Sequence, residues 1–177
     1  DAYILAWTTT PWTLPSNVAL CVNPDENYVK VKNGDYTYYL AEALCDTVLE
    51  GEYTVLETYK GKELEYKEYE PLFDYAVDIC AKQKKKAFYV VCDGYVTLTD
   101  GTGVVHTAPA FGEDDSKVGR KYDLPFVQLV DAKGEMTAET PWAGIFVKKA
   151  DPLVLQALEE KGLLFAAPSF EHSYPHC

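Results

Sequence analysis

Hydroxyl-bearing side chains are concentrated in one short segment near the start of the chain, Trp7-Thr-Thr-Thr-Pro-Trp-Thr-Leu-Pro-Ser-Asn17. Pro11 and Pro15 exclude both a continued strand and a helix interior, so we expect an irregular loop at a strand end. Hydroxyl groups donate and accept hydrogen bonds, which suits a ribose, a carbonyl oxygen or a bound water. The alternative is that the threonines only satisfy backbone groups of a turn, and composition alone favours that interpretation.

A histidine and several acids share a second segment, Asp100-Gly-Thr-Gly-Val-Val-His-Thr-Ala-Pro-Ala-Phe-Gly-Glu-Asp-Asp115. A short strand should end near His106, because Pro109 stops it, and Gly112 should lead into a helix with an acidic first turn. His106 and Asp115 would then lie one loop apart and could line one pocket. Taken alone, such a histidine is more often a structural hydrogen-bonding partner.

Two further groups of residues carry less weight. His172 and His176 are four residues apart, but Pro175 between them excludes a helical metal site, and no metal is predicted. The run Lys82-Gln-Lys-Lys-Lys86 could contact RNA phosphates, although a solvated loop is the more ordinary interpretation. The sequence has no phosphate-binding loop, dinucleotide fingerprint or nucleophile elbow, and no cofactor is expected.

Short strands dominate the elements that must position these residues. Runs rich in β-branched and aromatic residues lie at 3–7, 18–22, 28–32, 36–40, 53–59, 88–92, 103–106 and 126–130. Asn33-Gly34 between two of these runs predicts a hairpin with a type I′ turn. Many short strands with few helices predict a mainly β fold, a β-barrel core with peripheral α-helices.

Three helices are predicted beside the strands. The clearest runs from Pro152 to Lys161, with Asp151 as its N-cap and Gly162 as its C-terminal stop. A second should begin after Gly112, and a third should cover residues 41–49.

Composition limits the classes of function. The 177 residues include 16 Lys or Arg and 28 Asp or Glu, a net charge of −12, which argues against a broad grip on a nucleic-acid duplex but not against binding a short single-stranded end. Five cysteines without a C-x-x-C motif indicate free thiols and a cytoplasmic setting. The sequence contains no run of about 18 apolar residues, so no membrane span is predicted. Because the chain opens within a predicted strand and ends abruptly, we expect one domain, residues 1–177, excised from a larger protein.

Together the two polar segments resemble the editing domains of isoleucyl-tRNA synthetases, the connective peptide 1 insertions of these class I enzymes. Thr8 to Asn17 resembles their threonine-rich peptide, and Gly101 to Asp115 resembles their second signature. Residues 172–177 resemble the point of return to the synthetase body, so the resemblance spans nearly the whole chain. The valine and leucine counterparts read T-T-R-P in the first segment, where this chain has Thr10 in place of arginine. The aminoacylation signatures H-I-G-H and K-M-S-K-S are missing.

The resemblance implies a β-barrel with peripheral helices and a hydrolytic activity, the deacylation of mischarged valyl-tRNA(Ile). Valyl-adenylate is a second candidate substrate. Isoleucine and valine differ by one methylene, which a binding pocket discriminates by only about 1–3 kcal/mol, and isoleucyl-tRNA synthetase is the standard example of this limit. The implied partners are the 3′-terminal adenosine of the aminoacylated tRNA and the remainder of the synthetase chain, with no membrane.

The resemblance also implies roles for individual residues. Asp115 would bind the α-ammonium group of the substrate, with Asp114 as the alternative if the register shifts by one. His106 would lie beside the side-chain pocket and exclude isoleucine by its bulk. We expect the threonine-rich loop and the His/Asp stretch to line one small cleft.

A larger set of side chains would complete this site. The hydroxyl groups that would bind the adenosine, the ester oxygens and the attacking water belong to Thr8, Thr9, Thr10 and Thr13. Asn17 would support that loop. The apolar walls, or a stacking surface for adenine, would come from Trp7, Phe111 and Tyr174. No side chain is assigned as a general base, because an aminoacyl ester is already activated.

Other classes of function stay open at this point. One is a non-catalytic module that binds the end of a tRNA or docks a protein partner. Another is a general hydrolase of small esters, which would act without adenosine. Within the editing class, a valine- or leucine-type domain is disfavoured by Thr10 and Trp12.

Overall fold

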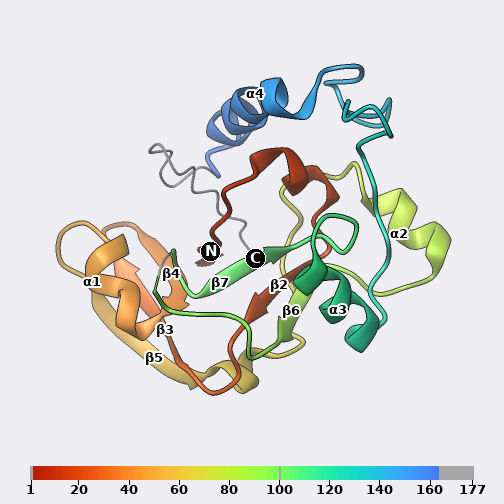
Figure 1. Ribbon diagram of the computed structural model, residues 1–177. Coiled ribbons are helices and arrows are strands. Elements are labelled where there is room, and N and C mark those ends of the chain that lie inside the picture. Colours follow the sequence, from red (N-terminus) through yellow and green to blue (C-terminus); the bar gives the residue numbers. More distant parts are fainter. Residues whose placement is uncertain (1, 100, 164–177) are drawn as a thin grey trace.

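Two mixed sheets form the centre of the computed structural model, which describes residues 2–99 and 101–163 (Figure 1). The first has the order β1-β4-β3-β5 and the second the order β6-β2-β7. The strands are β1 (Ala2–Ile4), β2 (Ala19–Val22), β3 (Asn27–Asn33), β4 (Tyr36–Ala41), β5 (Thr54–Lys60), β6 (Tyr89–Cys92) and β7 (Val104–Thr107). Each sheet has one parallel pair, β1 with β4 and β2 with β6, and the other pairs are antiparallel.

The N-terminal segment connects the two sheets. The amide of Leu5 donates to the carbonyl of Tyr39 in β4 at 3.1 Å, and the amide of Trp7 donates to the carbonyl of Val104 in β7 at 3.0 Å. The described residues nevertheless form two sheets and not one closed barrel. Mixed sheets with helices around them are therefore confirmed, whereas closure of the strands into a barrel stays a prediction.

Alternation along β2 places apolar side chains on both faces of its sheet. Leu20 and Val22 pack with Tyr28 and Tyr39 of the other sheet, and Ala19 and Cys21 pack toward the helices. All four residues of β2 are buried, as expected for a strand covered on both sides.

The hairpin between β3 and β4 is confirmed, but its turn lies one residue later than predicted. Asn33 pairs with Tyr36, so the two central residues are Gly34 and Asp35. Only Gly34 has a positive φ, 63°, which fits a glycine at the first central position of a type II′ turn and not the predicted type I′. Asn33 stays in the strand, where its side-chain amide donates to the carbonyls of Glu50 and Glu52.

Helices surround the sheets and only partly match the predicted ones. They are α1 (Cys45–Val48), α2 (Val77–Gln83), α3 (Glu113–Tyr122) and α4 (Val147–Glu160), with 3₁₀ helices η1 (Pro11–Ser16), η2 (Glu42–Leu44) and η3 (Gly61–Leu64). The start of α3 after Gly112 is confirmed, and η2 with α1 fills the range predicted at 41–49. The helix α2 was not predicted.

The start predicted for α4 is wrong, because the helix begins at Val147 and contains Pro152 in its interior. The amides of Lys149 and Ala150 donate to the carbonyl of Phe146, which starts the helix five residues early. Asp151 is not an N-cap. Its carboxylate accepts the amide of Trp12 at 2.9 Å and so ties α4 to η1.

Two other structural predictions are also wrong. The threonine-rich segment is not an irregular loop, because Pro11 begins and Pro15 continues the 3₁₀ helix η1. Residues 126–130 form no strand apart from an isolated bridge at Val130. The backbone groups of Phe126 are instead occupied by the side-chain amide of Gln83.

Within the described residues, no helix has the length and apolar character that a membrane crossing requires.

The buried hydroxyl of Tyr28 joins β3 to the turn before β7. It donates to the carbonyl of Gly103 and accepts the amide of Asn23. We expect Tyr28→Phe to lower the free energy of unfolding by about 1–3 kcal/mol, because both backbone groups lose a buried partner. Urea denaturation measures this change. The matched control is Tyr36→Phe, which removes an exposed hydroxyl and should have little effect; equal effects of the two substitutions would contradict the prediction.

Candidate functional site

The antiparallel pairing of β2 with β7 brings the two polar segments together. The helix η1 leads directly into β2, and the amide of Val18 donates to the carbonyl of Thr107 at the end of β7 at 3.1 Å. His106 on β7 pairs with Leu20 on β2, and its side chain is buried. The end of β7 therefore lies against η1, which brings His106 next to the threonine-rich segment.

Both ring nitrogens of His106 are held by residues of the threonine-rich segment. Nε2 lies 2.9 Å from Oγ1 of Thr13, and Nδ1 lies 2.7 Å from Nδ2 of Asn17. The amide nitrogen of Asn17 also donates to the carbonyl of Ala19 at 2.8 Å, which fixes the orientation of the carboxamide. A carboxamide nitrogen only donates, so Nδ1 of His106 is the acceptor.

The contact of His106 Nε2 with Thr13 shows which ring nitrogen carries the proton. The hydroxyl of Thr13 donates to the carbonyl of Thr10 at 2.8 Å, so it accepts a hydrogen bond from Nε2. His106 is therefore a neutral imidazole with its proton on Nε2. Burial lowers the pKa of His106 to about 3, so the ring stays neutral at physiological pH.

A series of hydroxyl groups continues from His106 toward the surface. Oγ1 of Thr10 lies 3.3 Å from Oγ1 of Thr13 and 3.4 Å from Oγ1 of Thr8, and the amide of Thr10 donates to Oγ1 of Thr8 at 3.1 Å. Thr8 and Thr13 are buried, whereas Thr10 is exposed. Thr9 is also exposed. The contacts thus bring Thr8, Thr10, Thr13, Asn17 and His106 together.

Tyr69 supports this cluster and was missed by the sequence analysis. Its buried hydroxyl donates to Oδ1 of Asn17, the atom that faces away from His106. The amide of Tyr69 donates to the carbonyl of Phe88, next to β6. Nothing in the sequence distinguishes Tyr69 from the other tyrosines of its segment, because the contact joins residues 52 positions apart.

Asp115 occupies the first turn of α3 and points back toward the end of β7. Its Oδ2 accepts the amide of Ala108 at 3.0 Å. Burial raises the pKa of Asp115 to about 6, although the hydrogen bond from Ala108 acts in the opposite direction. Asp114 is exposed, whereas Asp115 is half-buried, which supports the choice of Asp115. The threonine-rich segment and α3 therefore both contact residues 106–108. A single cleft shared by Thr9 and Asp115 stays a prediction.

An aromatic contact also connects the two polar segments. The rings of Trp12 and Phe111 meet edge to face with centroids 5.1 Å apart. Trp7 is half-buried and lies over Gly101, where a Cβ would come within 2.6 Å of the indole. Tyr174, the third predicted wall residue, lies outside the described residues. Across the described part of the chain, no three His, Cys, Asp or Glu side chains are grouped to hold a metal ion.

Comparison with known proteins identifies relatives of this chain. It is 57% identical over 178 residues to an isoleucine–tRNA ligase of Clostridium novyi, and this match covers all of the chain but only 17% of the relative. The chain thus spans about a sixth of the length of the ligases that it matches. No family model matches it.

Solved structures show the same fold at lower sequence identity. A leucyl-tRNA synthetase CP1 domain, GlLeuRS-CP1, superposes with a TM-score of 0.69 and 16% identity, covering 94% of this chain and 85% of that one. The editing domain of the cytosolic leucyl-tRNA synthetase of P. knowlesi gives 0.67 and 17%, covering 98% and 83%. The chain therefore matches a segment of isoleucine–tRNA ligases and has the fold of leucyl-tRNA synthetase editing domains.

The hydrogen-bond directions around His106 predict its titration. Between pH 5 and 8 the ring should stay neutral with its proton on Nε2, since its pKa is lowered to about 3. The unfolded chain takes up this proton near pH 6.5, so stability that is full above pH 6.5 is lost as the pH falls toward 3. Side-chain ¹⁵N NMR shifts of His106 report both the tautomer and the titration.

Asn17→Asp should reverse this behaviour. It replaces the donor at Nδ1 with a carboxylate that accepts, so the imidazolium form is favoured and the pKa of His106 should rise into or above the range from 5 to 8. The control is Asn33→Asp on β3, which should leave the titration unchanged. An unaltered His106 in the Asn17 variant would contradict the assigned hydrogen-bond direction.

Proposed function

We propose that residues 1–177 form an editing domain of an isoleucine–tRNA ligase that hydrolyses valine from mischarged tRNA(Ile). Valyl-adenylate is a second candidate substrate, and the proposed location is the cytoplasm. The matches to isoleucine–tRNA ligases and to the fold of editing domains support the class of function. The observation that carries the proposal is the joining of a hydroxyl-rich helix, a neutral histidine and a half-buried acid around residues 106–108.

The proposed anchor for the substrate is the carboxylate of Asp115. An aminoacyl ester carries an α-ammonium group, and a partly buried carboxylate binds such a cation more strongly than an exposed one does. Burial raises the pKa of Asp115, and a bound cation would favour its ionised form again. This contact would fix the ester relative to the attacking water.

The proposed hydrolysis needs no side-chain base. The oxygen of a water forms a bond to the ester carbonyl carbon, the carbon–oxygen bond to the ribose then breaks, and the water proton passes to the ribose oxygen. His106 is unsuited to accept that proton, because Nδ1 and Nε2 are both engaged and burial lowers the pKa to about 3. The hydroxyls of Thr8, Thr9 and Thr10 are the proposed groups that orient the water and stabilise the oxyanion.

His106 has a different proposed role as a wall of the side-chain pocket. With both nitrogens bonded to protein, a substrate beside the ring would meet its carbon atoms only. Asn17 and Thr13 hold the ring in place. Trp7 and Phe111, with Tyr174, remain the proposed apolar walls of the adenosine site, and the proposed partners are the 3′-terminal adenosine and the rest of the synthetase.

Removal of the proposed anchor gives the direct test. In the full-length synthetase, we expect Asp115→Asn to lower kcat/KM for valyl-tRNA(Ile) deacylation at least about 100-fold, the scale of a lost charge-assisted contact of about 3 kcal/mol. The matched control is its exposed neighbour, Asp114→Asn, which should stay within about threefold of wild type. The opposite ranking would assign the ammonium contact to Asp114. Deacylation unaffected by both substitutions would refute the proposed site.

The pH dependence follows from the same carboxylate. Because the pKa of Asp115 is raised to about 6, the ionised anchor is present above pH 6 and is lost as the pH falls below it. We expect kcat/KM for deacylation to fall about tenfold per pH unit below pH 6, with this limb absent in Asp115→Asn. A profile that is flat down to pH 4.5 in the wild-type enzyme would contradict the assignment.

Shortening the proposed wall should relax specificity. We expect His106→Ala to begin to hydrolyse correct isoleucyl-tRNA(Ile), since a methylene is worth only about 1–3 kcal/mol of discrimination. Hydrolysis of valyl-tRNA(Ile) by the same variant monitors its folding and catalysis. An unchanged preference for valine, with activity retained, would contradict the role of His106 as a wall.

A further inference from the structure

Positive charge in this acidic chain is concentrated at the C-terminal ends of α2 and α3. Residues 82–86 and 117–123 hold seven cations against one acid, a local charge of +6, so the rest of the chain carries −18. We call this surface the basic face, and it consists of Lys82, Lys84, Lys85, Lys86, Lys117, Arg120 and Lys121 together with Phe126. The macrodipole of α3 accounts for cations in its last turn but not for the run that follows α2.

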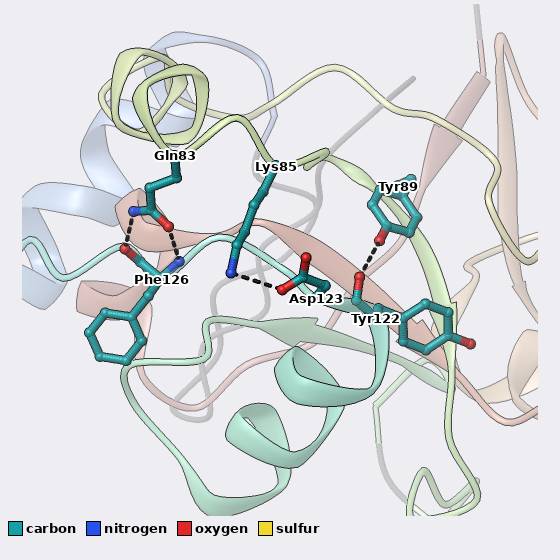
Figure 2. A network of polar contacts seen from close by, with 6 residues as sticks. All are labelled: Gln83, Lys85, Tyr89, Tyr122, Asp123 and Phe126. Carbon is teal, nitrogen blue, oxygen red and sulfur yellow. Dashed lines mark hydrogen bonds and ion pairs between the residues drawn. The ribbon is translucent and has the colours of Figure 1, made fainter.

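The two parts of the basic face are joined by direct contacts. Nζ of Lys85 lies 2.9 Å from Oδ1 of Asp123, and the hydroxyl of Tyr89 donates to the carbonyl of Tyr122 at 3.4 Å. Figure 2 shows the pair of Lys85 and Asp123 beside the contact of Gln83 with Phe126. The lysine run thus lies against the end of α3.

Most cations of the basic face are available to an external anion. Among the described residues, Lys82 and Lys84 are exposed and make no ion pair. The pairs of Lys86 with Glu68 and of Lys117 with Glu113 are exposed and 3.6–3.7 Å long. Exposed pairs of this kind are worth about 0–1 kcal/mol, so a phosphate group can replace the carboxylate.

Phe126 adds an exposed aromatic ring to this surface. Its side chain is 55% exposed, although its backbone is fixed on both sides: Gln83 donates to its carbonyl at 2.7 Å and accepts its amide at 2.8 Å. An exposed ring among cations, on a backbone that is held at both its amide and its carbonyl, is a combination with which proteins bind single-stranded nucleic acid, because the ring stacks on a base and the cations bind phosphates.

The helix α3 places its own part of the basic face at a defined distance from the proposed editing site. Asp115 lies in its first turn and Arg120 and Lys121 lie in its last turn. At 1.5 Å per residue, the axial separation is about 8–9 Å. A strand whose terminal nucleoside reached Asp115 and whose backbone ran along α3 would have its preceding phosphates near the end of that helix.

We propose that the basic face binds the single-stranded 3′ end of the tRNA, with cations on the phosphates and Phe126 stacked on a base. This inference rests on the proposed editing function and adds the surface that holds the strand outside the site. A duplex would need a wider cationic surface than an acidic chain offers, whereas a short single strand needs only a few contacts.

A charge-matched pair of variants of the full-length synthetase tests the proposal. The test variant carries Lys82→Gln, Lys84→Gln and Arg120→Gln, and the control carries Lys133→Gln, Lys148→Gln and Lys149→Gln, three exposed cations elsewhere. For the test variant we expect KM for valyl-tRNA(Ile) deacylation to rise about tenfold at low salt, with a slope of log KM against log salt reduced by about 2. Hydrolysis of 3′-O-valyl-adenosine, which has no phosphate, should not change.

Phe126 is tested separately by a stacking series. Phe126→Leu should raise the same KM at least about fivefold, the lower end for one lost base–aromatic stack, and Phe126→Tyr should restore it. The nucleoside ester again serves as the control substrate. Equal losses for Phe126→Leu and Phe126→Tyr would contradict stacking.

The outcomes separate this inference from the proposed function. Equal effects of the two triple variants, equal losses on the tRNA and the nucleoside ester, or no effect at all would each overturn the role of the basic face.

Photo-crosslinking from position 84, compared with position 148, does not depend on hydrolysis. Crosslinks from position 84 to the 3′ strand of the tRNA support the proposal, and their absence contradicts it. If the wild-type enzyme hydrolysed neither valyl-tRNA(Ile) nor 3′-O-valyl-adenosine, the editing function would be refuted, and the crosslinks would still test the basic face.

Discussion

The neutral imidazole of His106 is the constraint around which the polar cluster is organised. It accepts a hydrogen bond from Asn17 and donates one to Thr13, and these two contacts join η1 to β7 across 89 and 93 residues of sequence. The hydroxyl of Tyr69 donates to Oδ1 of Asn17, and the hydroxyl of Thr13 donates to the backbone carbonyl of Thr10. Each group can act in only one direction, because the carboxamide nitrogen only donates and the Thr13 proton is already used. The proton on Nε2 therefore follows from the hydrogen bonds of Thr13 and Asn17.

The two titratable groups of the candidate site respond to burial in opposite ways. Burial lowers the pKa of His106, which leaves the ring neutral, and raises the pKa of Asp115 to about 6, which leaves the carboxylate able to change its charge near physiological pH. Of these two groups, only Asp115 can carry a negative charge, and it lies in the first turn of α3. This division agrees with the proposed roles, in which the histidine acts by shape and the acid by charge.

Features that depend on neighbouring residues were predictable from the sequence, whereas features that depend on contacts between distant residues were not. Gly112 before three acids marked the start of α3, and Asn33-Gly34 marked the hairpin, although Asn33 remains in the strand because its side chain binds a distant loop. Asp151 before Pro152 has the pattern of a helix start, but its carboxylate binds Trp12, a contact across 139 residues that no local pattern contains. Tyr69 was missed for the same reason. Sequence reasoning brought His106 and Thr13 together only through the family resemblance, whereas the pairing of β2 with β7 provides the physical cause.

A pocket that excludes a substrate by bulk can discriminate only by as much free energy as it costs to displace the side chain that forms its wall. One methylene is worth about 1–3 kcal/mol, so a side chain that could move aside at a smaller cost would admit isoleucine as well as valine. Breaking a hydrogen bond to a buried polar group costs about 1–3 kcal/mol, and displacement of His106 would break the two that its ring makes with Asn17 and Thr13. The cost of moving the ring is thus of the same order as the discrimination required. In this view the hydroxyl and carboxamide groups behind the imidazole contribute to specificity without touching the substrate.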